Sequence, residues 1–177
     1  MELLVNVDGQ WMPEESVDWN ELDRTEINFI LVNPQGEAVA QADINNIFGK
    51  EVFDTLKEFK IKYAGRYTPQ LTIVNFVKVE SQYYGRGYGL EILKRIKPYI
   101  SANVYSVLYS QRILKQMYEV FGIPNSIIVE PGSLVKTPKL LEEMMPYLDQ
   151  NPVMVRGHDG NWYLDNDRSV RALWVTK

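Results

Sequence analysis

Short apolar runs separated by turn-forming residues make up the N-terminal third of the chain. The runs at residues 3–7, 27–32 and 38–44 are too short for helices, and they predict β-strands. The Asn-Pro-Gln-Gly sequence at 33–36 is a strong turn signal between the second and third runs. These two strands are therefore expected to form a hairpin.

The middle of the chain alternates helical and strand patterns. Helical spacing of apolar residues predicts an amphipathic helix over 50–63, closed by Gly65. A strongly β-prone run at 71–79 leads directly into the glycine-rich sequence 84–89. Apolar residues then return at helical spacing, and this helix is expected to end at Pro98. A strand, a glycine loop and a helix thus form the central unit.

A second strand and helix follow this unit. A strand is predicted at 104–108, and an apolar stripe after the N-cap candidate Ser110 predicts a helix. Gly122 and Pro124 are its stop signals. A further strand is expected at 126–129.

Residues 133–177 are interpreted as an extension packed on the same domain, whose core is residues 1–132. The extension is expected to hold a helix over 139–145, a hairpin that turns at 157–160, and a last strand at 170–175.

The composition excludes several kinds of chemistry. The chain has 177 residues, of which 45% are hydrophobic and 24% charged, as expected for one globular domain. It has no cysteine, so disulfides, zinc–thiolate sites and cysteine nucleophiles are excluded. Its single histidine, His158, cannot build a multi-histidine metal site, and we expect no metal.

Charge and hydropathy favour a cytoplasmic protein that binds neither nucleic acid nor membrane. The formal net charge of −4 gives no overall basic surface for nucleic acid. The N-terminus has no basic region followed by a long apolar stretch, and nowhere do 18 apolar residues run together. A homodimer is compatible with the sequence.

The glycine loop has a clear physical use. Glycines let the backbone turn sharply with its amides exposed, and the N-terminus of the next helix carries about half a positive charge. A phosphate or pyrophosphate fits such a site, and Arg86 adds a charged contact. A tight strand-to-helix turn without a ligand is the alternative.

Three well-known families of glycine loop do not fit. A Walker loop ends in Gly-Lys-Ser or Gly-Lys-Thr, which this loop lacks. A dinucleotide fingerprint requires a further glycine three residues after Gly89, where Ile92 stands. A protein kinase needs catalytic-loop and magnesium motifs that are missing here.

Two motifs in this chain instead resemble the GNAT superfamily of N-acetyltransferases. Residues 79–89 read Val-Glu-Ser-Gln-Tyr-Tyr-Gly-Arg-Gly-Tyr-Gly, where that family has Val-x-Pro-x-Tyr-Arg-Gly-x-Gly-x-Gly. Tyr84 is a departure, since the family has Gln or Arg there. The family's later motif, Asn-x-x-Ala-x-x-x-Tyr-x-x-x-Gly-Phe, is matched by Tyr118 and Gly122, with Gln111 at the Asn position and Leu114 at the Ala position.

The resemblance implies an α/β (α+β) fold with a mixed, mostly antiparallel central sheet flanked by helices. It also implies acetyl-CoA as co-substrate. In this family a bulged strand splays from its neighbour, and pantetheine pairs with the free edge. Main-chain groups of Lys78 and Val79 would offer this edge, Gln111 would also contact the cofactor, and the loop amides would cradle the pyrophosphate. The loop residues are Tyr84, Gly85, Arg86, Gly87, Tyr88 and Gly89.

The implied reaction is direct attack of a primary amine of a small molecule or protein on the thioester. Tyr118 is the candidate donor of a proton to the leaving thiolate. Glu80, at the end of the central strand, is the candidate general base; Asp43 on the hairpin and a chain of waters are alternatives. The rival hypothesis is a non-catalytic GNAT-like binding or structural protein. It is favoured by Tyr84, by the absence of the family's two helices between its first strands, and by the lack of an obvious base.

Overall fold

The computed structural model describes residues 1–63, 69–101, 103–108, 111–129, 133–135, 154–156, 162–164 and 170–175. Its strands, in chain order, are β1 (Glu2–Val7), β2 (Gln10–Pro13), β3 (Glu26–Val32), β4 (Ala38–Phe48), β5 (Gln70–Val79), β6 (Val104–Leu108), β7 (Ser126–Val129), β8 (Ser133–Val135), β9 (Met154–Arg156), β10 (Trp162–Leu164) and β11 (Val170–Trp174). Its helices are α1 (Lys50–Glu58), α2 (Tyr88–Ile96) and α3 (Gln111–Phe121), with short 3-10 turns η1 (Glu14–Ser16), η2 (Ser81–Tyr83) and η3 (Lys97–Tyr99).

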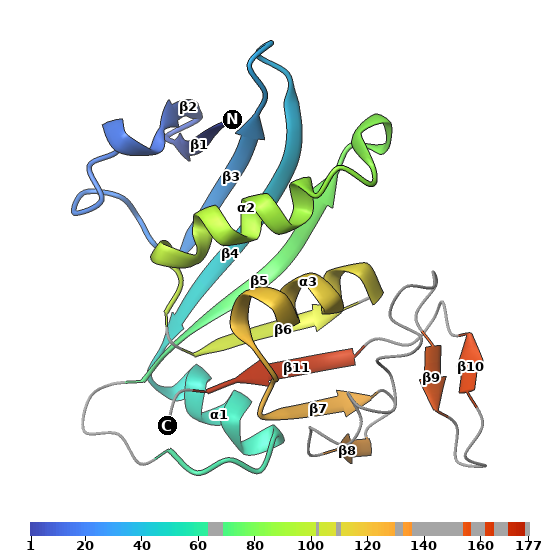
Figure 1. Cartoon of the computed structure of the whole chain (residues 1–177). Coiled ribbons are helices and arrows are strands. Elements are labelled where there is room, and N and C mark those ends of the chain that lie inside the picture. The colour runs from blue at the N-terminus through green and yellow to red at the C-terminus, as the bar shows by residue number, and fades with distance from the viewer. Residues whose placement is uncertain are drawn as a thin grey trace.

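Nine of these strands form one twisted sheet in the order β2-β1-β3-β4-β5-β6-β11-β7-β8 (Figure 1). The neighbours β5 and β6 run parallel, and every other neighbouring pair is antiparallel. The predicted hairpin is β3 and β4, and β9 and β10 form a separate hairpin. The mixed, mostly antiparallel sheet expected from the sequence is therefore confirmed.

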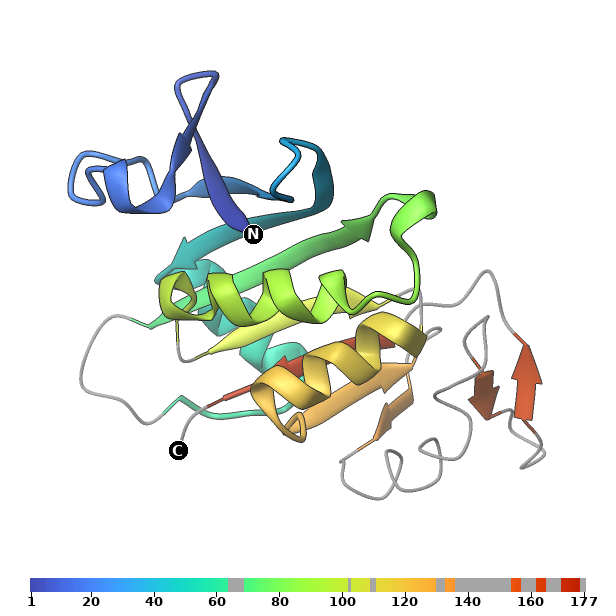
Figure 2. The same cartoon turned by 45° about the horizontal axis from the view of Figure 1, so that its top comes forward.

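Helices cover both faces of the sheet. Helices α2 and α3 lie side by side on one face, and α1 packs on the other (Figure 2). The larger core lies under α2 and α3 and includes Ile92, Leu93 and Met117, each fully buried. A smaller core joins α1 to the other face through residues such as Leu56 and Phe59. Each of the three helices thus packs on the sheet through its apolar stripe.

Helix α1 is shorter than the sequence predicts. Lys60 takes the left-handed conformation with φ 55°, and its N–H donates to the carbonyl of Lys57 at 3.0 Å. The N–H of Ile61 donates to the carbonyl of Leu56 at 2.9 Å. These two bonds form a Schellman motif, which ends the helix at Glu58 instead of near Gly65. A left-handed lysine carries no sequence signal as strong as a glycine.

The last described strand lies inside the sheet. Strand β11 pairs with β6 on one side and with β7 on the other, antiparallel to both. The predicted helix at 139–145 and the turn with His158 lie outside the described residues. In the ranges that the structure describes, no helix has the length and apolar character needed to span a membrane.

A buried polar network ties β4 to β5. The Thr72 hydroxyl donates to Asn46 Oδ1 at 2.6 Å, and Asn46 Nδ2 donates to the Arg24 carbonyl at 2.7 Å. The N–H of Ser101 donates in turn to Thr72 Oγ1 at 2.9 Å. Because Asn46 and Thr72 are 4% and 0% exposed, each lost bond would leave a polar group without water.

Replacing Asn46 by Ala is therefore expected to lower the free energy of unfolding by about 2 kcal/mol. Urea denaturation followed by circular dichroism measures this loss. The exposed Asn20 serves as the control, since Asn20→Ala removes an amide in contact with solvent. Equal stability of the two variants would contradict a stabilising role for the network.

Candidate functional site

Strand β5 is bulged at Asn75 and leaves its parallel neighbour there. Against β4, Asp43 pairs with Phe76 and Ile44 pairs with Val74, so Asn75 is the extra residue. The pairing with β6 covers only Thr72 to Val74. Beyond it, β5 rises away from β6 (Figure 1). The bulged and splayed strand implied by the resemblance is confirmed.

The splay leaves one edge of β5 open. From Phe76 to Val79 this strand pairs with β4 alone among the described residues. Strand β6 continues to Leu108, and its other edge is paired with β11 over its whole length. Lys78 and Val79, the two residues expected to offer main-chain groups to a ligand, lie on this open stretch. Free edge N–H and C=O groups are the ordinary template for an extended, amide-containing partner.

The open edge leads into the glycine loop. After the η2 turn, Gly85 and Gly87 have φ values of +79° and +80°, and Gly87 is the N-cap of α2. No side chain caps this helix, and its first helical bond runs from Glu91 N–H to the Gly87 carbonyl at 3.0 Å. The preceding amides of the first turn therefore point out of the helix end, where its dipole favours an anion.

A cavity of about 260 Å³ lies between the glycine loop and α3. Val79, Tyr84 and the backbone of the loop form one wall, and α3 contributes Lys115, Gln116 and Glu119. Lys115 brings a positive charge to this cavity. None of these three residues was predicted from the sequence as part of a site, although they lie on the same helix as Tyr118.

Gly89 allows the close packing of α2 against α3. A Cβ atom at this position would lie 2.7 Å from the side-chain amide atoms of Gln116. Any larger residue would displace this side-chain amide, which lines the cavity, so Gly89 determines where the amide of Gln116 lies.

Tyr83 anchors the loop to the β3–β4 hairpin. Its hydroxyl donates to Glu37 Oε2, and Arg86 lies over its ring, 5.5 Å from the centroid. This hydrogen bond lowers the pKa of the Glu37 carboxyl, with a smaller contribution from Asn33. Tyr83 is buried, in contrast to Tyr84, which is 59% exposed. The loop is thus held from outside the central unit.

The predicted catalytic residues lie at different places. Tyr118 is half-buried on α3 and packs against the larger core, one turn from the cavity residue Lys115. Glu80 follows β5 and forms an exposed ion pair with Lys78, with 3.8 Å between Oε1 and Nζ. Gln111 begins α3, and its side chain is not among those described. The roles predicted for these residues stay predictions.

A buried carboxylate lies at the bulge. Asp43, on β4, is 9% exposed; its Oδ2 accepts from Asn75 Nδ2 at 3.2 Å, and its Oδ1 is buried with no hydrogen-bond partner in the described structure. Burial raises the pKa of this carboxyl; the bond from Asn75 opposes the rise, and the charge of Glu26 adds to it.

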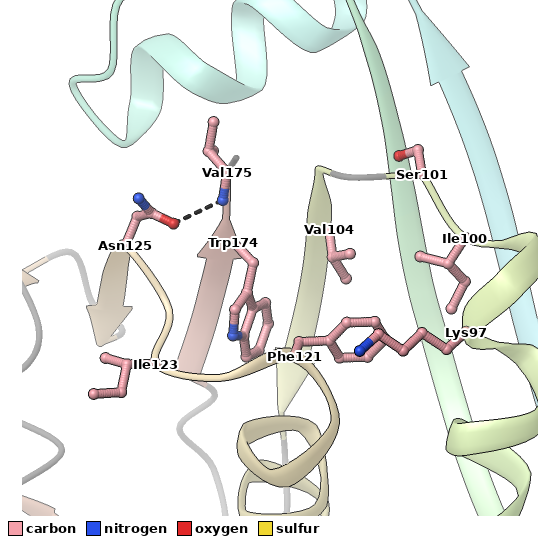
Figure 3. Close-up of a pocket in the computed structure, with 9 residues that line it drawn as sticks. All are labelled: Lys97, Ile100, Ser101, Val104, Phe121, Ile123, Asn125, Trp174 and Val175. Atoms are coloured by element: carbon pink, nitrogen blue, oxygen red, sulfur yellow. Dashed lines mark hydrogen bonds between the residues drawn. The ribbon is translucent and has the colours of Figure 1, made fainter. Parts of the chain in front are cut away.

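A second cavity, of about 320 Å³, lies near the other ends of α2 and α3 (Figure 3). Phe121 and Trp174 form much of its wall, with ring centroids 6.1 Å apart. Two of its polar side chains are engaged, since Asn125 Oδ1 accepts from the Val175 N–H at 2.7 Å and the Ser101 hydroxyl donates to the Asn103 carbonyl at 2.7 Å. This cavity is a gap in the packing of helices on the sheet.

No protein-family model matches the chain, and no curated protein sequence matches it. Similar solved structures include NAA60 from Arabidopsis thaliana in complex with a bisubstrate analogue, with 9% identity, coverage of 86% of this chain and 77% of the other, and a TM-score of 0.49. Arylalkylamine N-acetyltransferase 2 from Aedes aegypti gives 9% identity, coverage of 82% and 70%, and a TM-score of 0.44.

A tetramutant of the BH1408 protein from Bacillus halodurans gives 14% identity and a TM-score of 0.39, with 55% of this chain aligned. The chain spans 59% of the length of that structure. At these identities and TM-scores the likenesses do not establish an activity. The splayed strand and the glycine loop carry the proposal that follows.

Proposed function

We propose that the protein is an acyltransferase that moves an acetyl group from acetyl-CoA to a primary amine of a small molecule or a protein. The observation that carries this proposal is the open edge of β5, which runs from the bulge at Asn75 directly into the glycine loop. A ligand that extends along β5 would thus meet the free main-chain groups of the strand and then the free amides at the N-terminus of α2.

The residues present fit acetyl-CoA. The open edge at Lys78 and Val79 suits the two amides of pantetheine, as in strand addition. The N-terminus of α2 suits the pyrophosphate, and Arg86 and Lys115 bring positive charge to the same region. Acetyl-CoA supplies an activated thioester, which is why no cysteine or metal is needed for this chemistry.

The chain's own groups orient the amine and move protons. In the transfer a C–N bond forms as the C–S bond breaks, so the amine loses a proton and the sulfur needs one. Tyr118 is proposed as the donor to the sulfur. Two carboxylates are candidates for the base that takes the proton of the amine, Glu80 after the end of β5 and Asp43 at the bulge.

The alternative is a GNAT-like protein that binds without catalysis. It is favoured by the segment between β1 and β3, which holds only β2 and the η1 turn in place of two helices. Under this alternative the chain binds a ligand or protein at the open edge, and no acetylated amine appears.

Calorimetry with acetyl-CoA tests the proposal. We expect binding in the micromolar range, with Arg86→Gln and Lys115→Gln each lowering the affinity about 5-fold, since each removes roughly 1 kcal/mol of charge attraction. Lys50→Gln, an exposed charge change on α1, is the control. No heat at millimolar acetyl-CoA would overturn the proposal, and binding without product from any amine would favour the alternative.

A further inference from the structure

The face of the sheet opposite α2 carries a polar cluster at the bulge. Ala42 and Val77, which flank Asp43 and Phe76 along their strands, belong to the core under α2. Because successive side chains in a strand alternate, Asp43 and Phe76 point to the opposite face. Asn75 is on this face too, since its Nδ2 donates both to Asp43 and, at 2.6 Å, to Asn45 Oδ1.

The cluster is rich in hydrogen-bond acceptors and short of donors. Oδ1 of Asp43 has no protein donor within the described residues, although the residue is more than nine-tenths buried. Such an orphaned, buried carboxylate oxygen is costly to the folded state. Asn45 Oδ1 and the side-chain oxygen of Asn75 add further acceptors beside it. The missing component is a donor, and a positively charged donor would suit the carboxylate best.

An exposed aromatic residue is paired with Asp43 across the two strands. Phe76 is directly opposite Asp43 in the β4–β5 register, which places the two side chains about 5 Å apart at Cβ. Phe76 is 47% exposed, so a large apolar surface faces solvent at the position where β5 leaves β6. A carboxylate beside an aromatic face is the arrangement that binds an alkylammonium ion, by charge and by cation–π attraction.

We propose that Asp43 and Phe76 form the subsite for the ammonium group of a primary alkylamine acceptor, and that Asp43 receives the proton which this amine must lose. The inference rests on the proposed function, because it names the acceptor of that same site. The acceptor reaches the bulge from the face opposite α2, where Asn75 and Phe76 are exposed.

The proton step involves only the amine and the carboxylate. R–NH₃⁺ gives one proton to the Asp43 carboxylate, which produces neutral R–NH₂ and Asp43–COOH, and the acid later releases that proton to water. A carboxyl whose pKa is raised by burial holds the proton better than an exposed one. The ionisable groups on neighbouring rows of this face are Glu26 on β3 and, on β5, Lys78 and Glu80.

Binding is tested without acetyl-CoA, with butylammonium chloride as the probe and butanol as the uncharged control. Carboxyl ¹³C NMR follows the titration of Asp43, and we expect butylammonium to lower its pKa because a bound cation favours the charged form. Butanol should leave the titration unchanged. Phe76→Ala should weaken the effect of butylammonium, and Asp54→Asn, an exposed carboxylate on α1, should not.

Asp43→Asn gives the kinetic readout. We expect kcat/KM for alkylamines to fall by about 100-fold, the ordinary contribution of a general base. Acetyl-CoA affinity should not change, and Glu80→Gln should have the smaller effect. At pH values above the raised pKa of Asp43, the wild type buries a negative charge, and the Asp43→Asn variant should therefore unfold at a higher urea concentration than the wild type. This difference in stability should disappear as the pH falls through that pKa, because the wild-type carboxyl then becomes neutral.

The two proposals fail in distinguishable ways. The subsite is overturned if the pKa of Asp43 is the same with and without about 100 mM butylammonium, a concentration at which a site with a millimolar Kd would be saturated. An active Asp43→Asn enzyme overturns the proton role. A wild type that binds butylammonium at Asp43 but gives no heat with acetyl-CoA keeps the ammonium subsite and overturns the acetyltransferase.

Discussion

Replacing Gly87 by Val is expected to weaken acetyl-CoA binding by roughly 100-fold or more, which corresponds to about 2.7 kcal/mol. Gly87 has φ +80° and ψ 14° and is the N-cap of α2. A β-branched residue is strained in this conformation, so the backbone must rotate and carry the helix-end amides away from their present direction. Its side chain would also occupy part of the cavity that Gly87 lines. Calorimetry measures the affinity.

Gly9 offers a matched control for the backbone strain. It has φ +86° in the β1–β2 turn, and open space surrounds its Cβ direction as it does at Gly87. Gly9→Val should therefore lower the free energy of unfolding by about 1–2 kcal/mol without lowering the affinity for acetyl-CoA. If both variants bind as the wild type does, the loop is only a turn between β5 and α2.

Replacing Tyr118 by Phe is expected to lower kcat by about 100-fold while leaving the affinity for acetyl-CoA unchanged. The change removes one hydroxyl and keeps the ring that packs against the core, so the fold should be preserved. A group that only protonates the leaving sulfur acts in the chemical step, and its loss should appear in kcat. Stopped assays with saturating butylamine and acetyl-CoA measure the rate.

Tyr99→Phe is the control for the loss of a phenol. Tyr99 is half-buried in η3, and its hydroxyl donates to Glu14 Oε2 at 2.7 Å, far along α2 from the glycine loop. Its removal should leave kcat unchanged. A Tyr118→Phe enzyme with wild-type kcat would remove Tyr118 from the mechanism and leave solvent as the proton source.

Local patterns predicted the elements that build the site, but not the details that open it. The β-prone run, the glycine loop and the following helix were recognisable because each depends on a few neighbouring residues. The resemblance implied a bulged strand but not which residue is extra, since nothing in the unbroken run at 71–79 distinguishes an extra residue from a paired one. The position of the bulge at Asn75 becomes visible only through the register of β5 against β4.

The burial of Asp43 was equally hidden in the sequence. Its strand reads Ala-Asp-Ile-Asn-Asn-Ile, in which an alternating polar position normally faces solvent. Asp43 is paired with Asn28 on β3 and with Phe76 on β5, and these two neighbours depend on two different strand pairings. Long-range register, and not local propensity, thus converts a surface aspartate into a buried one.

The position of β11 between β6 and β7 has a consequence for how the chain folds during synthesis. Strands β1 to β5 are adjacent in sequence order or nearly so, and they can pair as soon as they leave the ribosome. Strand β7 cannot join the sheet until residues 170–174 have been made, because β11 is the only bridge between it and β6 in the described sheet. Such non-local pairing is slow. The boundary between β6 and β11 is therefore the seam between an early part of the sheet and a late one.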